Sequence, residues 1–216
     1  MPVKNPKEFW QEVRHAEEYE RVRFSGVLGN LYKYLEERAL QKACAGFAKG
    51  SRVLDVPVGT GRITSLLVRA GHKVVASDIA LPMMIVAKNK LNGDQARVPF
   101  LQGDIHCLPF PSHSFDAVMC IGLLMHQDTT GRLKTLQELS RVAKGPLVLQ
   151  YGCTSGLLML KTRLTGRNPG DVRFTVTIDD VMTDLAQCDL VELSRSWVLR
   201  PFSSSLILVA GRRHSR

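Results

Sequence analysis

Short apolar segments alternate with helical patterns through the middle of the chain, and this alternation limits the fold more than any other feature. The patterns predict strands at 52–56, 73–78, 98–101, 115–120 and 147–151, with helices at 62–69, 82–91 and 129–143. Strands separated by helices form βαβ units, in which helices cover both faces of a parallel sheet. The sequence therefore predicts an α/β fold with a mostly parallel sheet.

The last third of the chain has a different pattern. A helix is predicted at 178–186, and strands at 190–199 and 205–210 follow it with only a short loop around Pro201 between them. Two strands joined so closely pair antiparallel as a hairpin. We therefore expect one antiparallel hairpin after the βαβ units.

The first part of the chain is rich in charge, with apolar and aromatic residues at intervals. Over residues 7–48 this pattern favours two amphipathic helices, broken near Ser25–Gly26 and Gly29–Asn30. A chain of 216 residues suits one globular domain with a modest extension. We therefore expect an N-terminal helical extension at 1–49 and an α/β domain at 50–216.

Composition excludes several classes of protein. With 44% hydrophobic and 23% charged residues, the chain can bury a core without disulfides or a metal, so disordered, collagen-like and disulfide-scaffold classes are excluded. The five cysteines have apolar neighbours and no CxxC pattern, which indicates buried thiols in a reducing compartment, and no metal site is expected. No run approaches the roughly 18 apolar residues of a membrane span. We therefore expect a soluble, cytoplasmic protein.

The net charge of +9 raises the question of a nucleic-acid partner. The basic excess is spread along the chain, apart from a connection at 161–173 and the tail at 212–216. A nucleic-acid-binding face normally concentrates its charge in a patch or stripe. Nucleic acid is therefore an alternative partner that the charge pattern does not favour.

A glycine-rich turn joins the first predicted strand to the helix that follows it. Asp55 ends the strand and Gly59-Thr60-Gly61 ends the turn, where glycines let a ligand approach the backbone at the start of a helix. Asp78 ends the second strand, near the spacing of about 20 residues at which an acid binds ribose hydroxyls. Asp104 follows the third strand. Three acids at one sheet edge, without a phosphate-binding P-loop motif, favour a neutral or cationic nucleoside.

Three segments are specific in combination: VLDVPVGTGR at 53–62, VVASDIALPMM at 74–84 and FLQGDIHCLPFPSHSFDAVMC at 100–120. They resemble class I S-adenosylmethionine-dependent methyltransferases, particularly the branch with ubiquinone and menaquinone biosynthesis enzymes, and the resemblance covers about residues 50–210. It implies a Rossmann-like, seven-stranded sheet in the order 3-2-1-4-5-7-6, with strand 7 antiparallel and helices on both faces. Pro57 departs from the family pattern, because it stands where the first loop glycine usually lies.

The resemblance implies S-adenosyl-L-methionine as cofactor, S-adenosyl-L-homocysteine as product, and a role for each matching residue. The residues expected around the methionine end and the sulfonium are Asp55, Gly59, Thr60, Gly61 and Cys120. Those expected around the ribose and the adenine are Asp78, Ile79, Met83, Asp104 and Ile105, with Asp78 on the ribose hydroxyls and Asp104 on the adenine amino group.

Several further residues are candidates for the acceptor side of the site. His126 follows the fourth strand and is a candidate general base, because neutral histidine can accept a proton near pH 7; a hydrogen-bonded loop histidine is the alternative. His106 is a candidate for lining the pocket or for a base, and Tyr19 for closing over the site or for packing. The resemblance places the basic connection over the acceptor, where Arg163, Arg167 and Arg173 would bind an acidic or phosphorylated group.

The predicted function is methyl transfer to a small-molecule acceptor, such as a quinone, another metabolite, a lipid precursor or a natural product. Direct in-line displacement depends mainly on positioning and on the exclusion of water, so it requires few strictly chemical residues. A tRNA or rRNA methyltransferase is one alternative, although the base-flipping motif Asn/Asp-Pro-Pro-Tyr/Phe is absent. A non-catalytic S-adenosylmethionine-binding protein is another, which only an activity measurement separates from an enzyme.

Overall fold

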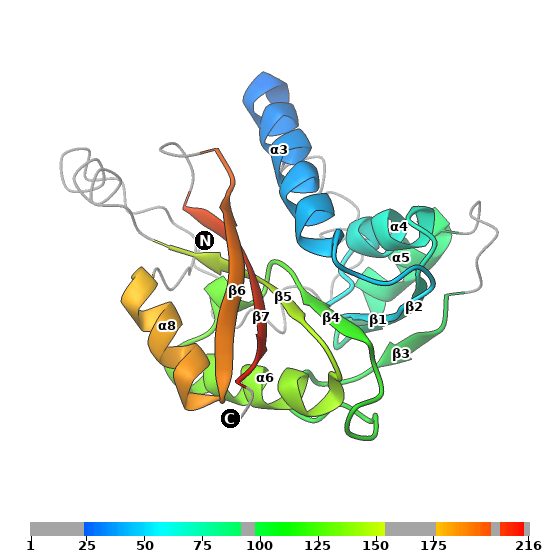
Figure 1. Ribbon diagram of the computed structural model, residues 1–216. Coiled ribbons are helices and arrows are strands. Elements are labelled where there is room, and N and C mark those ends of the chain that lie inside the picture. Colours follow the sequence, from blue (N-terminus) through cyan, green and yellow to red (C-terminus); the bar gives the residue numbers. More distant parts are fainter. Residues whose placement is uncertain (1–23, 92–97, 154–175, 200–203, 214–216) are drawn as a thin grey trace.

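The computed structural model describes residues 24–91, 98–153, 176–199 and 204–213 (Figure 1). Seven strands form one sheet in the order β3-β2-β1-β4-β5-β7-β6. Their bounds are β1 Arg52–Asp55, β2 Lys73–Asp78, β3 Phe100–Gln102, β4 Ala117–Cys120, β5 Leu147–Gly152, β6 Leu190–Trp197 and β7 Ser205–Arg212. The pairs among β1 to β5 are parallel, whereas β7 is antiparallel to both β5 and β6. The predicted α/β class, strand order and hairpin are confirmed.

Helices cover both faces of this sheet, because both faces of its central strands are apolar. The helices are α3 Gly26–Cys44, α4 Arg62–Arg69, α5 Leu81–Leu91, α6 Thr129–Val142 and α8 Ile178–Gln187, with a short 3-10 turn η1 Leu124–His126. Alternate residues of one strand point to opposite faces. Val53 packs in the cluster that contains Leu40 of α3 and Leu67 of α4, and its neighbour Leu54 packs with residues of α6 and α8. Figure 1 shows these helix pairs on opposite sides of the sheet.

Most predicted elements lie within two residues of their observed bounds, and one prediction about the N-terminal part is wrong. Helix α3 runs without interruption through Gly29 and Asn30, where a break was expected. A Cβ atom at Gly29 would lie 2.5 Å from the backbone carbon of Phe24. This glycine therefore allows two backbone segments to approach closely and does not end the helix. The expected helix before Ser25 lies outside the described residues.

Two smaller expectations also meet the structure. Four of the cysteines are buried, but Cys107 is exposed, so the expectation of a buried thiol is wrong there; it lies in the loop after β3, away from the sheet core. In the described part of the chain, no helix combines the length and the apolar character needed to span a membrane. Helix α8 begins with Thr177 as its N-cap, in a reciprocal capping box with Asp180.

A buried ion pair joins α6 to α8 beneath the sheet. Arg132 and Asp184 are only 3% and 2% exposed, and Arg132 Nε donates to Asp184 Oδ2 at 2.6 Å. The same guanidinium donates to the backbone carbonyl of Gln127 at 3.2 Å and to Thr129 Oγ1 at 3.2 Å. Arg132 thus fixes the start of α6 and the end of the loop that follows η1.

We expect Asp184→Ala to lower the free energy of unfolding by about 3–5 kcal/mol, because it leaves the Arg132 charge buried without its partner. Asp179→Asn, at an exposed position of the same helix, should change it by less than about 1 kcal/mol. Urea unfolding followed by circular dichroism measures both. A loss in Asp184→Ala no larger than in the control would contradict this role.

Candidate functional site

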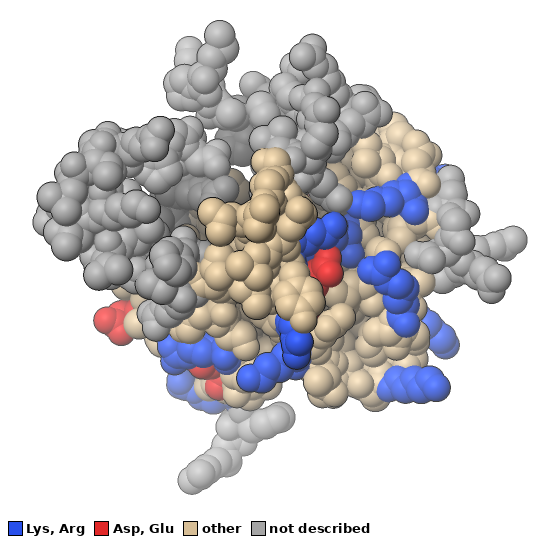
Figure 2. Space-filling view, turned by 90° about the horizontal axis from the view of Figure 1, so that it is seen from above, with Lys and Arg blue, Asp and Glu red and all other residues tan. Residues whose placement is uncertain are grey.

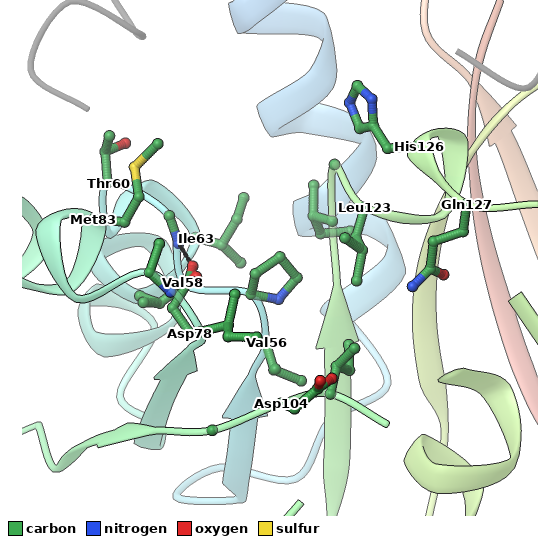
Figure 3. Close-up of a pocket in the computed structure, with 18 of the residues that line it drawn as sticks. Val56, Val58, Thr60, Ile63, Asp78, Met83, Asp104, Leu123, His126 and Gln127 are labelled. Carbon is green, nitrogen blue, oxygen red and sulfur yellow. Dashed lines mark hydrogen bonds between the residues drawn. The ribbon is translucent and has the colours of Figure 1, made fainter. Parts of the chain in front are cut away.

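A pocket opens at the carboxyl ends of β1, β2 and β4, beside the loop that follows β3 (Figure 3). Parallel strands bring their carboxyl ends to one edge of a sheet, and open α/β sheets bind ligands there. Nine of the residues expected around a cofactor or acceptor line this pocket: Gly59, Thr60, Asp78, Ile79, Met83, Asp104, Ile105, His106 and His126. Pro57 also lines it.

Asp78 connects the end of β2 to the glycine loop. Its Oδ2 accepts a hydrogen bond from the Gly59 backbone N–H at 2.9 Å, and its Oδ1 accepts one from the Ala80 N–H at 2.9 Å. Its side chain is buried, and this burial raises the carboxyl pKa above its ordinary value. A carboxylate oxygen has two lone pairs, so each oxygen retains an acceptor position after these bonds.

The loop that Asp78 holds has a backbone shape that depends on glycine. Gly61 has φ +79°, in the left-handed region, and a Cβ there would lie 3.0 Å from the Ala87 Cβ of α5. Glycine at this position therefore meets both a conformational and a packing requirement. The loop consequently packs against α5 on one side and borders the pocket with Gly59 and Thr60 on the other.

Three of the expected cofactor residues do not line the pocket. Asp55 and Cys120 are completely buried at the ends of β1 and β4, and Gly61 lies at the start of α4. Asp55 Oδ2 accepts a hydrogen bond from Thr64 Oγ1 at 2.6 Å, and burial raises the Asp55 pKa to about 7. Burial likewise raises the pKa of the Cys120 thiol far above its ordinary value. The Cys120 thiol therefore stays protonated and is unreactive.

A chain of polar contacts crosses the pocket wall from Asp104 to α6. His106 Nδ1 lies 3.3 Å from Asp104 Oδ1, and His106 Nε2 lies 3.3 Å from Gln127 Nε2. Thr135 Oγ1 donates to Gln127 Oε1 at 3.0 Å, so the Gln127 amide nitrogen is the donor toward His106. This network assigns the His106 proton to Nδ1, facing Asp104. Sequence reasoning missed Gln127, because nothing but its place after His126 marks it.

His126 ends η1 and lies apart from this chain. In Figure 3, His126 and Asp104 occupy opposite ends of the drawn site, and Leu123 lies between them. The structure thus brings both histidines to one pocket but into different surroundings. Tyr19, Arg163, Arg167 and Arg173, which were expected on the acceptor side, lie outside the described residues.

Arg62 is a further pocket residue that sequence reasoning missed as a candidate. It is the first residue of α4, directly after Gly61, and it forms an ion pair with the fully buried Glu36 of α3. Its place at the end of the motif VLDVPVGTGR could have marked it as a candidate site residue. Its partner could not be foreseen, because Glu36 lies in another helix, 26 residues earlier in the chain.

Comparison with known proteins finds relatives of the central part of the chain. A family model described as a methyltransferase domain matches residues 53–145. A demethylmenaquinone methyltransferase of Clavibacter sepedonicus is 41% identical over 96 residues, which are 44% of this chain and 38% of that protein. A ubiquinone/menaquinone biosynthesis C-methyltransferase of Hahella chejuensis is 36% identical over 113 residues, 50% of this chain and 45% of that protein. The chain thus matches less than half the length of these curated relatives.

Solved structures show the same fold over nearly the whole chain. Magnesium protoporphyrin IX methyltransferase from Synechocystis PCC 6803, with bound S-adenosylhomocysteine, has a TM-score of 0.80 at 21% identity, covering 95% of this chain and 97% of that one. A Burkholderia thailandensis 1,6-didemethyltoxoflavin-N1-methyltransferase has a TM-score of 0.70 at 19% identity, covering 99% and 93%. The expected resemblance to ubiquinone and menaquinone methyltransferases is therefore supported over the central part of the chain, where residues 53–145 match the methyltransferase-domain model, and the solved structures show that the fold is shared.

Proposed function

We propose that this protein is an S-adenosylmethionine-dependent methyltransferase that acts on a small-molecule acceptor. The observation that carries the proposal is the Asp78 carboxylate, which is held against the glycine loop in a pocket that Asp104 also lines. The relatives named above support it, since all are called methyltransferases, and both solved structures were determined with S-adenosylhomocysteine bound.

The residues of the pocket suit the parts of this cofactor. Asp78 would accept from the ribose hydroxyls, because a carboxylate can accept from both members of a vicinal diol. Asp104 would accept from the adenine amino group, with Ile79, Met83 and Ile105 around the ring. Asp55 Oδ1 is buried and has no hydrogen-bond partner in the described structure, so a cationic amino group at the methionine end would satisfy it.

The chain's own contribution to methyl transfer is mainly one of position. S-adenosylmethionine supplies, when bound, a methyl group on a positively charged sulfur that leaves as a neutral thioether. The glycine loop and the ends of β1 and β4 would hold that end of the cofactor, while Leu123 and Ile121 give the pocket an apolar wall. Fixing two reactants in line replaces an encounter between separate molecules, and the apolar wall excludes water from the reacting atoms.

His126 is the better of the two histidines for a general base. The Nε2 lone pair of His106 already faces the Gln127 amide, and its Nδ1–H faces Asp104, so an acceptor would have to displace one of these bonds. His126 lies at the opposite end of the drawn site from Asp104 (Figure 3), and it lines the pocket together with Ile121 and Leu123, which follow β4. We assign His126 the removal of a proton from a hydroxylated acceptor.

A small molecule suits this site better than an RNA. On the described part of the face seen in Figure 2, Lys and Arg form several separate groups and no continuous basic stripe. The relatives described above are named for small ring compounds, among them quinones, a porphyrin and a toxoflavin precursor. We therefore propose a small cyclic metabolite as the methyl acceptor.

Methyl-labelled S-adenosylmethionine tests both parts of this proposal. We expect incubation with protein-free cell extract to move label into a small organic-soluble compound, and incubation with total RNA to leave the RNA unlabelled. Label in RNA would overturn the choice of acceptor. Binding of the cofactor without transfer to any fraction would identify a non-catalytic binding protein.

Asp78→Ala should weaken S-adenosylmethionine binding by about 1–3 kcal/mol, the usual cost of removing a hydrogen-bond partner of a buried group. Asp78→Asn, which can still accept from Gly59, should lose less. Isothermal titration calorimetry measures both, with Asp179→Asn as the exposed control. Unchanged affinity in Asp78→Ala would remove Asp78 from the cofactor site.

With a hydroxylated acceptor, His126→Ala should lower kcat by a factor of about 10² or more and leave cofactor affinity nearly unchanged, because a general base acts only on the reaction. Wild-type turnover in His126→Ala would exclude the base role.

Asp55→Asn should raise the stability of the protein above pH 7 and weaken its binding of the cofactor. Because burial raises the Asp55 pKa from 3.8 to about 7, the folded state holds a proton that the unfolded state has released, so wild-type stability falls as pH rises between these values. From pH 5 to pH 8, Asp55→Asn should gain roughly 2 to 3 kcal/mol of stability relative to wild type, while binding the cofactor more weakly. Urea unfolding of both proteins at pH 5 and at pH 8 measures the gain. A stability difference between Asp55→Asn and wild type that is the same at both pH values would contradict the raised Asp55 pKa.

A further inference from the structure

The Arg62 guanidinium occupies a defined position at the edge of the pocket. Arg62 begins α4, contributes to the pocket lining, and has a side chain that is only 13% exposed. Its planar group also lies over the Phe24 ring, 5.3 Å from the ring centroid. A guanidinium so confined has few orientations available, and it can bind a carboxylate through paired N–H donors.

Glu36 fixes this guanidinium from the far side. Arg62 Nη2 donates to Glu36 Oε2 at 2.5 Å, and Glu36 is completely buried in α3. The other oxygen, Oε1, accepts from Gln150 Nε2 of β5 at 2.6 Å and from the Tyr32 hydroxyl at 3.1 Å. Gln150 Nε2 is also within 2.8 Å of Ser205 Oγ of β7. The Glu36 carboxylate is therefore held by groups from α3, β5 and α4, and it holds Arg62 in turn.

This arrangement leaves one nitrogen of Arg62 unsatisfied. Nη1 is buried and has no hydrogen-bond partner in the described structure. Buried donors of a charged group normally have partners, and each exception needs an explanation. Asp55 Oδ1 is likewise buried and has no hydrogen-bond partner in the described structure. Burial raises the Asp55 pKa, and the positive charge of Arg62 is close enough to oppose this rise in part, after the hydrogen bonds from Thr64. Two unsatisfied groups of opposite charge thus lie near each other at the glycine loop.

We propose that Arg62 binds the α-carboxylate of the cofactor's methionine part through Nη1, and that Glu36 is the positioning residue that turns this nitrogen toward it. An amino-acid end carries an ammonium group and a carboxylate, which match the unsatisfied Asp55 oxygen and the unsatisfied Arg62 nitrogen. The inference rests on the proposed function, since it names a contact to the same cofactor.

Two consequences follow from the proposed contact. Nucleosides that carry the amino-acid end should bind more tightly than nucleosides that lack it, because only the former satisfy the buried Arg62 donor. Because Glu36 belongs to α3, the packing of this helix against β5 should affect how well the site recognises the amino-acid end. Helix α3 would then contribute to cofactor recognition from outside the glycine loop.

Calorimetric titration of the full chain with two ligands tests the contact. S-adenosylhomocysteine carries the amino-acid end, whereas 5′-methylthioadenosine keeps the adenosine and the sulfur but lacks the carboxylate. We expect Arg62→Lys to weaken the binding of S-adenosylhomocysteine by a factor of roughly ten to a hundred, the cost of a lost hydrogen bond between charged groups, and to leave 5′-methylthioadenosine nearly unchanged. Lysine retains a positive charge for the buried Glu36, so the fold should survive.

Three further variants separate this contact from a merely structural effect. Glu36→Gln with Arg62→Met removes both charges, leaves neither unpaired, and should show the same selective loss. Glu36→Gln alone should reduce the preference for S-adenosylhomocysteine several-fold, as expected of a positioning residue. Arg69→Met, at an exposed position of α4, is the matched control and should change neither affinity.

Each outcome has one interpretation. Equal losses for both ligands in Arg62→Lys and in the double variant, or no loss for either, would overturn the Arg62 contact while leaving the proposed function intact. Wild-type protein that binds neither ligand would overturn the proposed function itself.

Discussion

The structure depends on the burial of its central strands on both faces. Val53 and Leu54 of β1 and Val118 and Met119 of β4 are all completely buried, between helices on either side. With no water on either face, the backbone groups of these strands must pair within the sheet, and parallel pairing results. Parallel strands end at one edge, so Asp55 at the end of β1 and Asp78 at the end of β2 come to the same edge.

Several polar groups near this edge are buried, and burial of such groups lowers stability. Asp55, Glu36 and the Arg62 guanidinium are buried or nearly so, and each of them except Glu36 has an atom without a hydrogen-bond partner in the described structure. Such groups destabilise a folded protein unless a ligand supplies the missing hydrogen bonds. Arg62 lines the pocket and the other two lie behind its wall, which is an arrangement expected where a protein gives up stability for ligand binding.

Sequence patterns predicted those residues of the pocket whose positions depend on local structure. Asp78 and Gly59 could be predicted, because strand ends and glycine turns leave short-range signals. Glu36 and Gln127 could not, because their roles come from contacts with distant segments: Glu36 meets Gln150, 114 residues further along the chain. Gly29 was misread for a similar reason, since a glycine required by close packing against Phe24 has the same local appearance as one that ends a helix.

The central claim is that the pocket between the glycine loop and Asp104 holds S-adenosylmethionine. A crystal structure of the full chain with S-adenosylhomocysteine tests it most directly. The account predicts the ribose hydroxyls within hydrogen-bond distance of the Asp78 carboxylate, and the adenine beside Ile79 and Ile105. A ligand bound at saturating concentration in any other part of the molecule, with this pocket empty, would contradict it.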